Sequence, residues 1–136
     1  MIYGDTKVYT PEGWCEARQL RDGDAIYSWW LRWWRPNTIK RVHQGAARTC
    51  YSLVSFDGVA PRVFRCTADQ RVRNGRRYVK AEDLLAGSLL TMSDGANLCQ
   101  AELSMVEKEV HDQPQPTFGF QLEKGGAYLA GGILCQ

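Results

Sequence analysis

The sequence predicts an all-β domain, and three observations support this prediction. Short runs rich in Val, Ile, Tyr, Phe and Trp recur along the 136 residues. Turn-forming combinations that contain glycine separate these runs at short intervals. The segments with a helical pattern cover only about one or two turns each. No linker or charge block divides the chain, so we expect one domain over residues 1–136.

The expected elements alternate between extended segments and turns. Extended chain is expected at 7–9, 25–34, 48–56, 63–66, 71–73, 104–112, 117–122 and 128–134, where β-branched and aromatic residues favour strands. The turn signals are Pro11-Glu12-Gly13, Asp22-Gly23, Asp57-Gly58, Asn74-Gly75, Asp94-Gly95, Gly125-Gly126 and Gly131-Gly132. One short helical turn is expected at 81–85 and a second at the similar segment that begins at Ala17. Residues 93–108 are expected to form a surface connection.

Part of the chain is repeated at an offset of 64 residues, the separation of Asp5 from Asp69. The matching pairs are Asp5 and Asp69, Val8 and Val72, Trp14 and Tyr78, Ala17 and Ala81, Leu20 and Leu84, Gly23 and Gly87, and Ile26 and Leu90. Two such β-turn-β units can pack around a pseudo-twofold axis, because each covers the apolar face that the other cannot bury alone. We predict that the axis brings Asp5-Thr6 and Asp69-Gln70 to one place, and that a functional site lies there.

Composition and charge exclude several classes of protein. The chain is 44% apolar and 24% charged, which is ordinary for a globular domain, and its net charge is +2. It has no apolar run of the roughly 18 residues that a membrane helix needs, and its first residues do not have the pattern of a signal peptide. The five widely spaced cysteines include no C-x-x-C motif, which argues against a disulfide framework or a structural zinc site. We therefore expect a monomeric cytoplasmic protein.

Three segments together carry a resemblance to a known family. They are GDTKVYTPEGWCEARQLRDGDAIYS from Gly4, CTADQRVRNGRRYVKAEDLLAGSLL from Cys66, and GAYLAGGILCQ from Gly126. In this order they resemble the Hint (hedgehog/intein) superfamily, and most closely a mini-intein without an endonuclease domain. The resemblance implies a flat, horseshoe-shaped all-β fold with an internal pseudo-twofold. It also implies an autocatalytic domain that needs no cofactor and whose partners are the flanking segments of its own chain.

The resemblance assigns the first part of the reaction to residues near the N-terminus and the middle of the chain. In this superfamily a thiol or hydroxyl at the first residue attacks the preceding carbonyl and converts an amide into an ester or thioester. That position is occupied by Met1, whose thioether cannot be an acyl-transfer nucleophile. A T-x-x-H motif polarises the same amide, and its histidine protonates the amide nitrogen. The segment TADQ keeps Thr67 and Asp69 but has Gln70 at the histidine position, where it can donate a hydrogen bond but not a titratable proton near neutral pH.

The remaining expected site groups lie near the end of the chain. An aspartate within a motif like VYDL helps to orient the branched intermediate, and the segment VHDQ supplies Asp112, with His111 at the tyrosine position. A closing His-Asn pair releases the C-terminal bond, because the Asn side-chain nitrogen attacks its own carbonyl. Aligned on the pattern GILV, Cys135 takes the Val position and Gln136 the His position, so that the Asn would follow. Aligned on the terminus, Gln136 replaces the Asn and would have to close a six-membered imide.

Three explanations fit these departures from the pattern. The chain is an intein whose reactive residues were replaced or trimmed, or an unusual intein in which a nucleophile beyond the C-terminal end attacks the upstream bond directly. The third explanation is an inert Hint fold that serves as a binding or structural module. We predict that the isolated chain does not splice, because Met1 and Gln70 replace the nucleophile and the acid.

The aromatic tract WWLRWWRP at 29–36 has two interpretations. On a single strand, residues 29, 31 and 33 would face the core, and Trp30 and Trp34 would hold Arg32 between them in a cation–π stack. Alternatively, the tract is an exposed aromatic patch that docks a partner. Basic residues also gather nearby, at Arg62, Arg65, Arg71, Arg73, Arg76, Arg77 and Lys80. Because the net charge is only +2, we expect a solvated strand face there rather than a nucleic-acid site.

Other nucleophile and metal sites have little support in the sequence. Cys66 is expected to pack as a small apolar group, and Cys135 could act as a thiolate only if a neighbour lowered its pKa. A cysteine–histidine hydrolase would need one of them beside His111 with Asp112 orienting the ring, but adjacent residues on a strand face opposite ways. His43 lies 68 residues from His111 with no third ligand in suitable spacing, so we expect no metal site.

Overall fold

The protein is described here by a computed structural model that covers residues 1–30, 32–56 and 60–136. Its strands are β1 (Ile2–Tyr3), β2 (Lys7–Thr10), β3 (Gly13–Glu16), β4 (Ala25–Trp30), β5 (Trp33–Phe56), β6 (Pro61–Cys66), β7 (Arg71–Asn74), β8 (Arg77–Lys80), β9 (Leu89–Ser93), β10 (Leu98–Leu122), β11 (Ala127–Ala130) and β12 (Ile133–Cys135). Two 3₁₀ turns, η1 (Ala17–Gln19) and η2 (Ala81–Asp83), are the only helical elements in these ranges. All of these strands join one sheet. The predicted all-β class is therefore confirmed.

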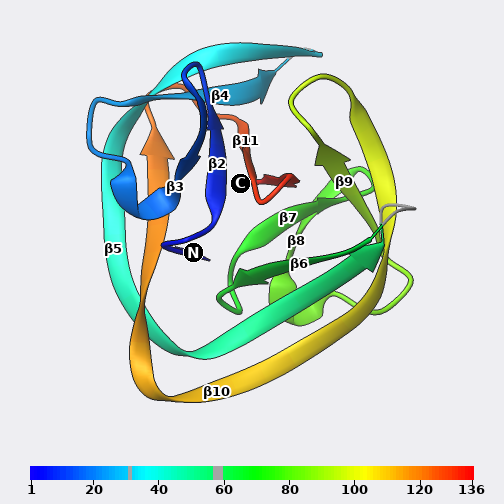
Figure 1. The fold of residues 1–136 in the computed structure, drawn as a ribbon. Coiled ribbons are helices and arrows are strands. Elements are labelled where there is room, and N and C mark those ends of the chain that lie inside the picture. Colours follow the sequence, from blue (N-terminus) through cyan, green and yellow to red (C-terminus); the bar gives the residue numbers. More distant parts are fainter. Residues whose placement is uncertain (31, 57–59) are drawn as a thin grey trace.

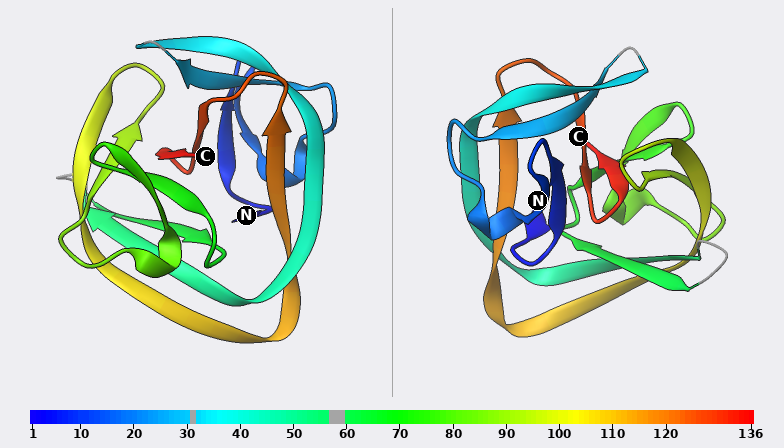
Figure 2. Two further views of the ribbon diagram at one scale, coloured as in Figure 1. Left: turned by 180° about the vertical axis from the view of Figure 1, so that it is seen from behind. Right: turned by 45° about the horizontal axis from the view of Figure 1, so that its top comes forward.

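Two long strands form the frame of the molecule. β5 and β10 contain 24 and 25 residues and pair antiparallel along most of their length. Irregularities in their register, the widest between Val110 and Gln115, let the pair bend sharply. Figure 1 shows the pair running around the outside of the molecule and turning a corner, with both chain ends near the centre. The views in Figure 2 agree with this arrangement, so the curved ladder encloses the termini.

The repeat in the sequence is a repeat in the structure. Each element of the first unit has a counterpart 64 residues later: β2 and β7, β3 and β8, η1 and η2, and β4 and β9. The hydrogen bonds repeat as well, since Ala17 N–H donates to Thr6 O at 2.8 Å and Ala81 N–H donates to Gln70 O at 2.8 Å. Ile2 pairs across the sheet with Cys66, its own counterpart. The pseudo-twofold axis therefore passes beside this pair, and the predicted internal symmetry is confirmed.

One turn explains why glycine recurs in both units. Gly23 and Gly87 have φ angles of 90° and 95°, which a residue with a Cβ adopts only at a cost. Their N–H groups donate to Ile39 O at 2.8 Å and to Leu103 O at 2.7 Å. Each glycine therefore ties the end of one repeat unit to a long strand, β5 or β10.

The matched apolar positions of the repeat make up the core. The pairs Val8 and Val72, Ala17 and Ala81, Leu20 and Leu84, and Ile26 and Leu90 are all at most 4% exposed and lie in one cluster. Ile39 and Leu103, from the long strands, complete it. Burying a leucine or isoleucine stabilises the fold by about 1.5–3 kcal/mol. The two units thus cover each other's apolar face, as the repeat predicted.

Two sequence-based strand assignments were wrong in detail. Residues 25–34 do not form one strand, because Arg32 has a φ of 71° and Trp30 pairs with Trp33 across a tight hairpin. Residues 128–134 form two strands, β11 and β12, since the Gly131-Gly132 turn reverses the chain between them. The range 93–108, predicted as a surface connection, contains the turn between β9 and β10, which pair from Ser93 and Leu98 onward. The predicted Asp57-Gly58 turn and the predicted orientation of Leu31 fall outside the described residues.

The hairpin also changes the arrangement of the tryptophans. Trp29 and Trp34 are cross-strand neighbours, and their rings meet edge to face with centroids 4.9 Å apart. The guanidinium over Trp30 belongs to Arg35, at 5.0 Å from the ring centroid, and not to Arg32. A short strand reversal was not visible in the sequence because the turn contains neither Gly nor Pro. No described helix has the length and apolarity to span a membrane.

Candidate functional site

The turn after β6 holds the N-terminal residue. The Met1 nitrogen donates to Thr67 Oγ1 at 2.7 Å, and Thr67 N–H donates to Met1 O at 2.9 Å. Thr67 Oγ1 lies 2.6 Å from Asp69 Oδ1 and 3.2 Å from Met1 O. A hydroxyl has one proton, and the shorter contact to a carboxylate receives it. Thr67 therefore accepts from the Met1 nitrogen while it donates to Asp69.

Two charged groups face each other across this turn. Burial lowers the pKa of the Met1 ammonium, and the Asp69 carboxylate partly opposes that shift. The hydrogen bond from Thr67 lowers the pKa of Asp69, with the nearby ammonium adding to the effect. The Met1 nitrogen lies 3.7 Å from Asp69 Oδ1, and the Asp69 side chain is 75% exposed. This ion pair is weak because water screens it, so the geometry of the turn depends on Thr67.

Gln70 connects the middle of the chain to its end. Its side chain is 4% exposed, and its Nε2 donates to Arg71 O at 2.9 Å and to Gln136 O at 3.2 Å. Both amide protons are therefore used on carbonyl oxygens, and Gln70 holds the C-terminal residue rather than the Met1 nitrogen. Gln136 N–H also donates to Arg71 O at 3.1 Å, which extends β12 along β7.

The two chain ends share one cleft of about 340 Å³. It is lined by Met1, His43, Asp69, Gln70, Arg71, Gly119, Phe120, Tyr128 and Gln136. We call this the terminal cleft. Of the residues predicted for the site, Met1, Asp69, Gln70 and Gln136 line it, and Thr67 contacts Met1 directly.

Cys135 precedes Gln136 but has its side chain in the core. It is fully buried, and its Sγ donates to Ile133 O at 3.3 Å. Burial raises its pKa, and burial likewise raises the pKa of Cys66 to about 12. Both groups are thiols at neutral pH, so neither has the depressed pKa of a thiolate nucleophile. The expectation that Cys66 packs as a small apolar group agrees with its burial.

The structure does not bring Asp112 to the terminal cleft. Asp112 lies in the irregular part of the β5–β10 ladder, where its carbonyl oxygen accepts from Arg48 Nη2 at 3.1 Å. It does not line the cleft, and it is seven residues, at most roughly 23 Å of chain, from Gly119, which does. A Cβ placed on Gly119 would lie 3.3 Å from Met1 Cγ, so Gly119, like Thr117, is a residue of β10 that faces Met1. The segment TFGF at 117–120 has the aromatic-x-apolar pattern of VYDL, but it lacks the Val and the Asp that VHDQ shares with that motif.

His43 was not recognised as a cleft residue from the sequence. It pairs with Gly119 across the β5–β10 ladder, and its Cβ is 4.0 Å from a Cβ placed on that glycine. Only the strand register, which no local motif encodes, brings it there.

The Met1 side chain fills the space that two glycines leave on the long strands. Its Sδ is 3.3 Å from a Cβ placed on Gly45 and accepts from Thr117 Oγ1 at 3.3 Å. The thioether is thus held in place as a packing group. No described cluster of three His, Cys, Asp or Glu side chains could hold a metal ion.

The predicted meeting of Asp5-Thr6 with Asp69-Gln70 was wrong. Asp5 and Thr6 line a different cleft, which shares no lining residue with the terminal cleft. The reason is geometric, because the axis runs beside Ile2 and Cys66 and the two dipeptides lie on opposite sides of it. The basic residues between Arg62 and Lys80 are likewise divided: Arg62 and Arg65 line the second cleft, and Arg71 lines the terminal cleft.

Comparison with known proteins gives matches at the level of structure alone. No protein-family model matches the sequence, and no curated protein matches it. Among solved structures, a bacterial intein-like domain from Clostridium thermocellum is 17% identical with a TM-score of 0.85, over 98% of this chain and 96% of that one. The gp41-1 intein is 16% identical with a TM-score of 0.79, over 98% and 95% of the two chains.

A third solved structure agrees with these two. A DnaB intein from Synechocystis is 13% identical with a TM-score of 0.83, over 98% of this chain and 95% of that chain. At sequence identities this low, the structural similarity shows a shared fold and does not show a shared reaction. Over nearly its whole length, this chain has the Hint fold of inteins and intein-like domains.

Proposed function

We propose that the chain is a protein-splicing domain of the mini-intein type, in a form that lacks two reactive groups. The observation that carries the proposal is the meeting of Met1 and Gln136 in one cleft, where Gln70 bonds to Gln136 and Thr67 to Met1. A domain that joins its flanking segments must hold both of its ends close together. Holding reacting groups in place contributes about 7–11 kcal/mol to such a reaction.

The contacts of Met1 suggest how the upstream bond would be held. In a chain with a preceding segment, the Met1 nitrogen is the amide nitrogen of the bond to be broken. Thr67 Oγ1 accepts from this nitrogen, and Asp69 fixes the hydroxyl by accepting its proton. A nucleophile at position 1 would attack the preceding carbonyl carbon, the C–N bond would break, and the nitrogen would need a proton. Met1 supplies no nucleophile and Gln70 supplies no proton. The first step of the reaction, the attack on the preceding carbonyl, therefore cannot take place in this sequence.

An inert Hint module is the second candidate function. The packing of the Met1 thioether against Gly45 and Gly119 favours it, because the side chain is used to fill space. The same applies to Gln70, whose two amide protons are both used to hold carbonyl oxygens.

Thiol-induced cleavage at the N-terminal bond separates the two candidates. A soluble carrier protein is fused before residue 1, and Met1→Cys is combined with Gln70→His. We expect dithiothreitol to release the carrier, which mass spectrometry detects as the free carrier thioester or acid. The matched control, Met1→Cys with Gln70 retained, should cleave at least about tenfold more slowly, because general acid catalysis contributes about 10²–10⁴-fold. An intact, folded fusion protein for the double variant would favour the inert module.

A further inference from the structure

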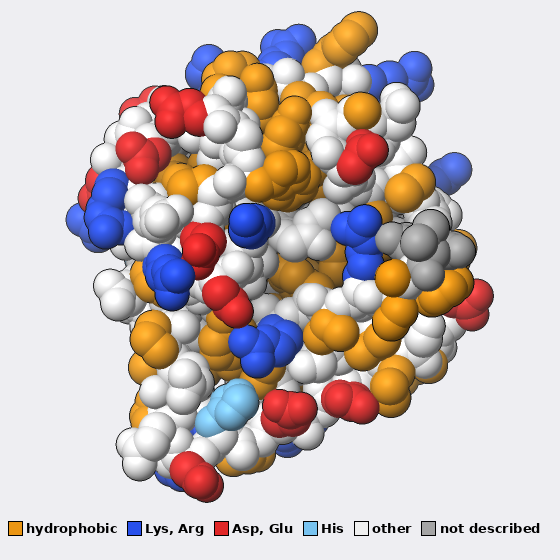
Figure 3. Space-filling model, in the orientation of Figure 1, with side chains coloured by type: hydrophobic (Ala, Val, Ile, Leu, Met, Phe, Trp, Pro, Cys, Tyr) orange, Lys and Arg blue, Asp and Glu red, His pale blue; other side chains and the backbone are white. Residues whose placement is uncertain are grey.

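The second cleft is larger than the terminal cleft and is its symmetry mate. It has a volume of about 440 Å³, within the range of about 300–1,000 Å³ that ligand sites have. Figure 3 shows a hollow in this face with Lys and Arg side chains beside it. Asp5, Thr6, Lys7 and Phe64 stand 64 residues before Asp69, Gln70, Arg71 and Tyr128 of the terminal cleft. We call it the β6 groove, because Arg62, Val63, Phe64 and Arg65 of β6 form one wall.

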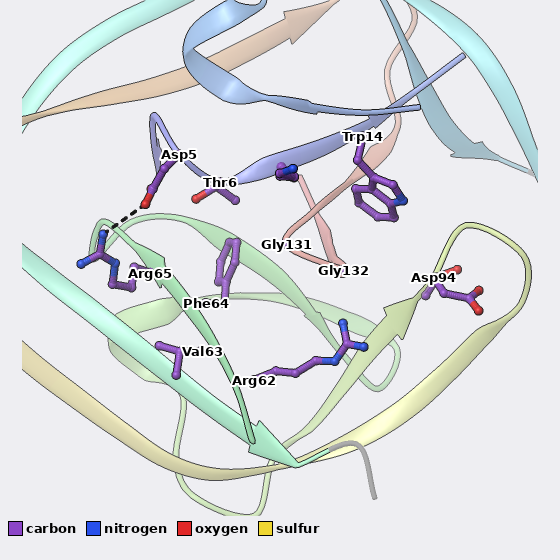
Figure 4. Close-up of a pocket in the computed structure, with 12 residues that line it drawn as sticks. Asp5, Thr6, Trp14, Arg62, Val63, Phe64, Arg65, Asp94, Gly131 and Gly132 are labelled. Atoms are coloured by element: carbon purple, nitrogen blue, oxygen red, sulfur yellow. Dashed lines mark ion pairs between the residues drawn. The ribbon is translucent and has the colours of Figure 1, made fainter. Parts of the chain in front are cut away.

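The opposite wall and the floor come from three other parts of the chain. Figure 4 shows Asp5 and Thr6 facing β6 from across the groove, with Trp14 of β3 and the Gly131-Gly132 turn beyond them. A Cβ placed on Gly131 would lie 3.0 Å from the Phe64 ring, so this turn packs directly on β6. The groove therefore follows the length of β6 and is not an isolated pit.

The edge of β6 that faces the groove has main-chain groups available for pairing. Thr67 N–H donates to Met1 O, on the side of β1. In an antiparallel strand, alternate residues direct their N–H and C=O groups to the same side. Val63 and Arg65, four and two residues before Thr67, therefore direct their N–H groups toward β1 and the groove, and not toward β5. β1 pairs with β6 only at Ile2 and Cys66, so it leaves the edge uncovered at Val63.

Two further observations support this orientation. Pro61 is two residues before Val63, so the main-chain nitrogens of both face the same side of β6. Proline has no N–H group and is tolerated only where the nitrogen faces away from a paired strand, which places this side of β6 away from β5. The Val63 side chain is also 60% exposed, which is unusual for a valine on a strand with covered edges.

The charges at the groove select the kind of segment that would pair there. The lining has three cations, Lys7, Arg62 and Arg65, and two anions, Asp5 and Asp94. Arg65 meets Asp5 at 3.7 Å, with side chains 44% and 66% exposed, so this ion pair is weak and can open for another carboxylate. The guanidinium of Arg65 also lies 5.6 Å from the Tyr3 ring centroid, which holds it at the mouth of the groove.

We propose that the β6 groove binds an extended segment of a partner protein that carries carboxylate side chains, and that this segment adds a strand to the edge of β6. Main-chain hydrogen bonds to Val63 supply the pairing, because Tyr3 of β1 lies opposite Arg65, and Lys7 and Arg65 supply the charge selectivity. This proposal does not depend on splicing chemistry. It names a binding role that an inert Hint module and an active splicing domain could both have.

Other occupants fit less well. The flanking segments of this chain start from Met1 and Gln136, and both residues line the terminal cleft instead. A second copy paired edge to edge through β6 would bring the cations Lys7 and Arg65 of both molecules to one seam. Like charges at such short range oppose pairing.

The test uses a ten-residue peptide of alternating Val and Glu with a fluorescein label, and two variants of it. One variant has Gln for every Glu, and the other has Pro for the central Val residues. Fluorescence anisotropy of the labelled peptides with the 136-residue chain should show saturable binding of the Glu peptide only. In amide NMR spectra, the signals of Val63 and Arg65 should shift most.

Substitutions in the protein separate main-chain pairing from charge. Val63→Pro removes one outward N–H, so it should raise the Kd at least about tenfold, while Val63→Ala changes it less than about twofold. Arg65→Glu should also raise the Kd about tenfold, while Arg77→Glu on β8, outside the groove, should not. If Val63→Pro disturbs folding, the Pro-containing peptide tests the same main-chain pairing, because it removes N–H groups from the peptide instead of from the protein.

Three results would overturn the proposal. The first is equal binding of the Glu and Gln peptides. The second is binding of the Glu peptide that does not saturate up to about 1 mM protein, the weakest affinity expected of a specific site. The third is a set of amide NMR shifts centred on Met1 and Gln136. Thiol-induced cleavage of the Met1→Cys, Gln70→His fusion serves as a separate readout. Loss of peptide binding with cleavage intact would reject this inference alone, and loss of cleavage with binding intact would reject only the splicing proposal.

Discussion

Thr67 controls the geometry around the first residue through a single hydroxyl group. It accepts from the Met1 nitrogen at 2.7 Å and donates to Asp69 at 2.6 Å, and its own N–H holds the Met1 carbonyl. Because Asp69 is largely exposed, no other described contact fixes its carboxylate so closely. The clamp therefore depends on Thr67 more than on the weak ion pair.

Replacing Thr67 by alanine should raise the pKa of Asp69 toward its ordinary value. The hydrogen bond from Thr67 is the largest cause of the lowered pKa, and removing it leaves the carboxylate less stabilised. In the native protein, the lowered pKa stabilises the fold at pH values above about 3.9, the ordinary value for Asp. This stabilisation is lost as the pH falls through the pKa of the folded state.

Carbon-detected NMR titration of the Asp69 carboxyl group measures this shift. Thr67→Ser keeps the hydroxyl and should leave the titration midpoint close to that of the native chain. An unchanged midpoint in Thr67→Ala would show that the hydrogen bond does not control this carboxylate.

The sequence identified several of these residues but not their neighbours. Met1, Thr67, Asp69 and Gln70 follow from local motifs, because each lies within a short, recognisable stretch. Gly119 and His43 do not, because strand register across the β5–β10 ladder brings them to the cleft. Asp112 follows from the match of VHDQ to a motif like VYDL, but it lies in the irregular part of the same ladder and does not line the cleft.

At the level of elements, the repeat units contribute matched parts of the core. Leu20 and Leu84 are counterparts, and each is 4% exposed. Each follows a 3₁₀ turn: Leu20 N–H donates to Ala17 O, and Leu84 N–H donates to Ala81 O, both at 3.2 Å. Their environments are therefore similar in burial and in hydrogen bonding.

Leu20→Ala and Leu84→Ala should each destabilise the fold by about 2–4 kcal/mol, because both leave a cavity in the core. The matched control is Leu85→Ala, since Leu85 is 74% exposed and should cost less than about 0.5 kcal/mol. Urea denaturation followed by tryptophan fluorescence measures the free energy of unfolding. A large effect at one leucine and none at its counterpart would contradict the shared role of the two units.

The turn between β11 and β12 is sensitive to a single methyl group. Gly131 has a φ of 59°, and a Cβ there would lie 3.0 Å from the Phe64 ring. Gly131→Ala should therefore destabilise the fold by about 1–3 kcal/mol through backbone strain and steric contact. Gly125→Ala is the control, because a Cβ at Gly125 has nothing within 4 Å. Equal thermal midpoints for the two variants would contradict this account of the turn.

Element prediction succeeded where a pattern was local and failed where it was not. The repeat supported the strands predicted at β2, β4 and β7, because each unit has a counterpart in the other. The hairpin at Trp30 and Trp33 was missed because its tip has no turn residue, and Arg32 carries the positive φ that glycine usually supplies. The joining of 104–112 with 117–122 into β10 was missed because Pro114 and Pro116 lie between them.

At the scale of the whole molecule, the pseudo-twofold axis explains where the chain ends lie. The axis passes beside Ile2 and Cys66, so the N-terminus is central, and the last strand pairs with β7 and β9 of the second unit. Two related clefts result, one at the chain ends and one along β6. The same symmetry thus produces a site that could rearrange peptide bonds and a groove that could bind a peptide.

Splicing of a fully restored chain tests this account most directly. The domain is placed between two carrier proteins, with Met1→Cys, Gln70→His and Gln136→His, an Asn added after residue 136, and a Cys at the start of the second carrier. We predict that mass spectrometry detects the two carriers joined by a peptide bond and the free domain, because both ends lie in the terminal cleft. An intact precursor, from a domain whose NMR spectrum shows it to be folded, would contradict the claim that this cleft is built to exchange the bonds at the ends of the chain.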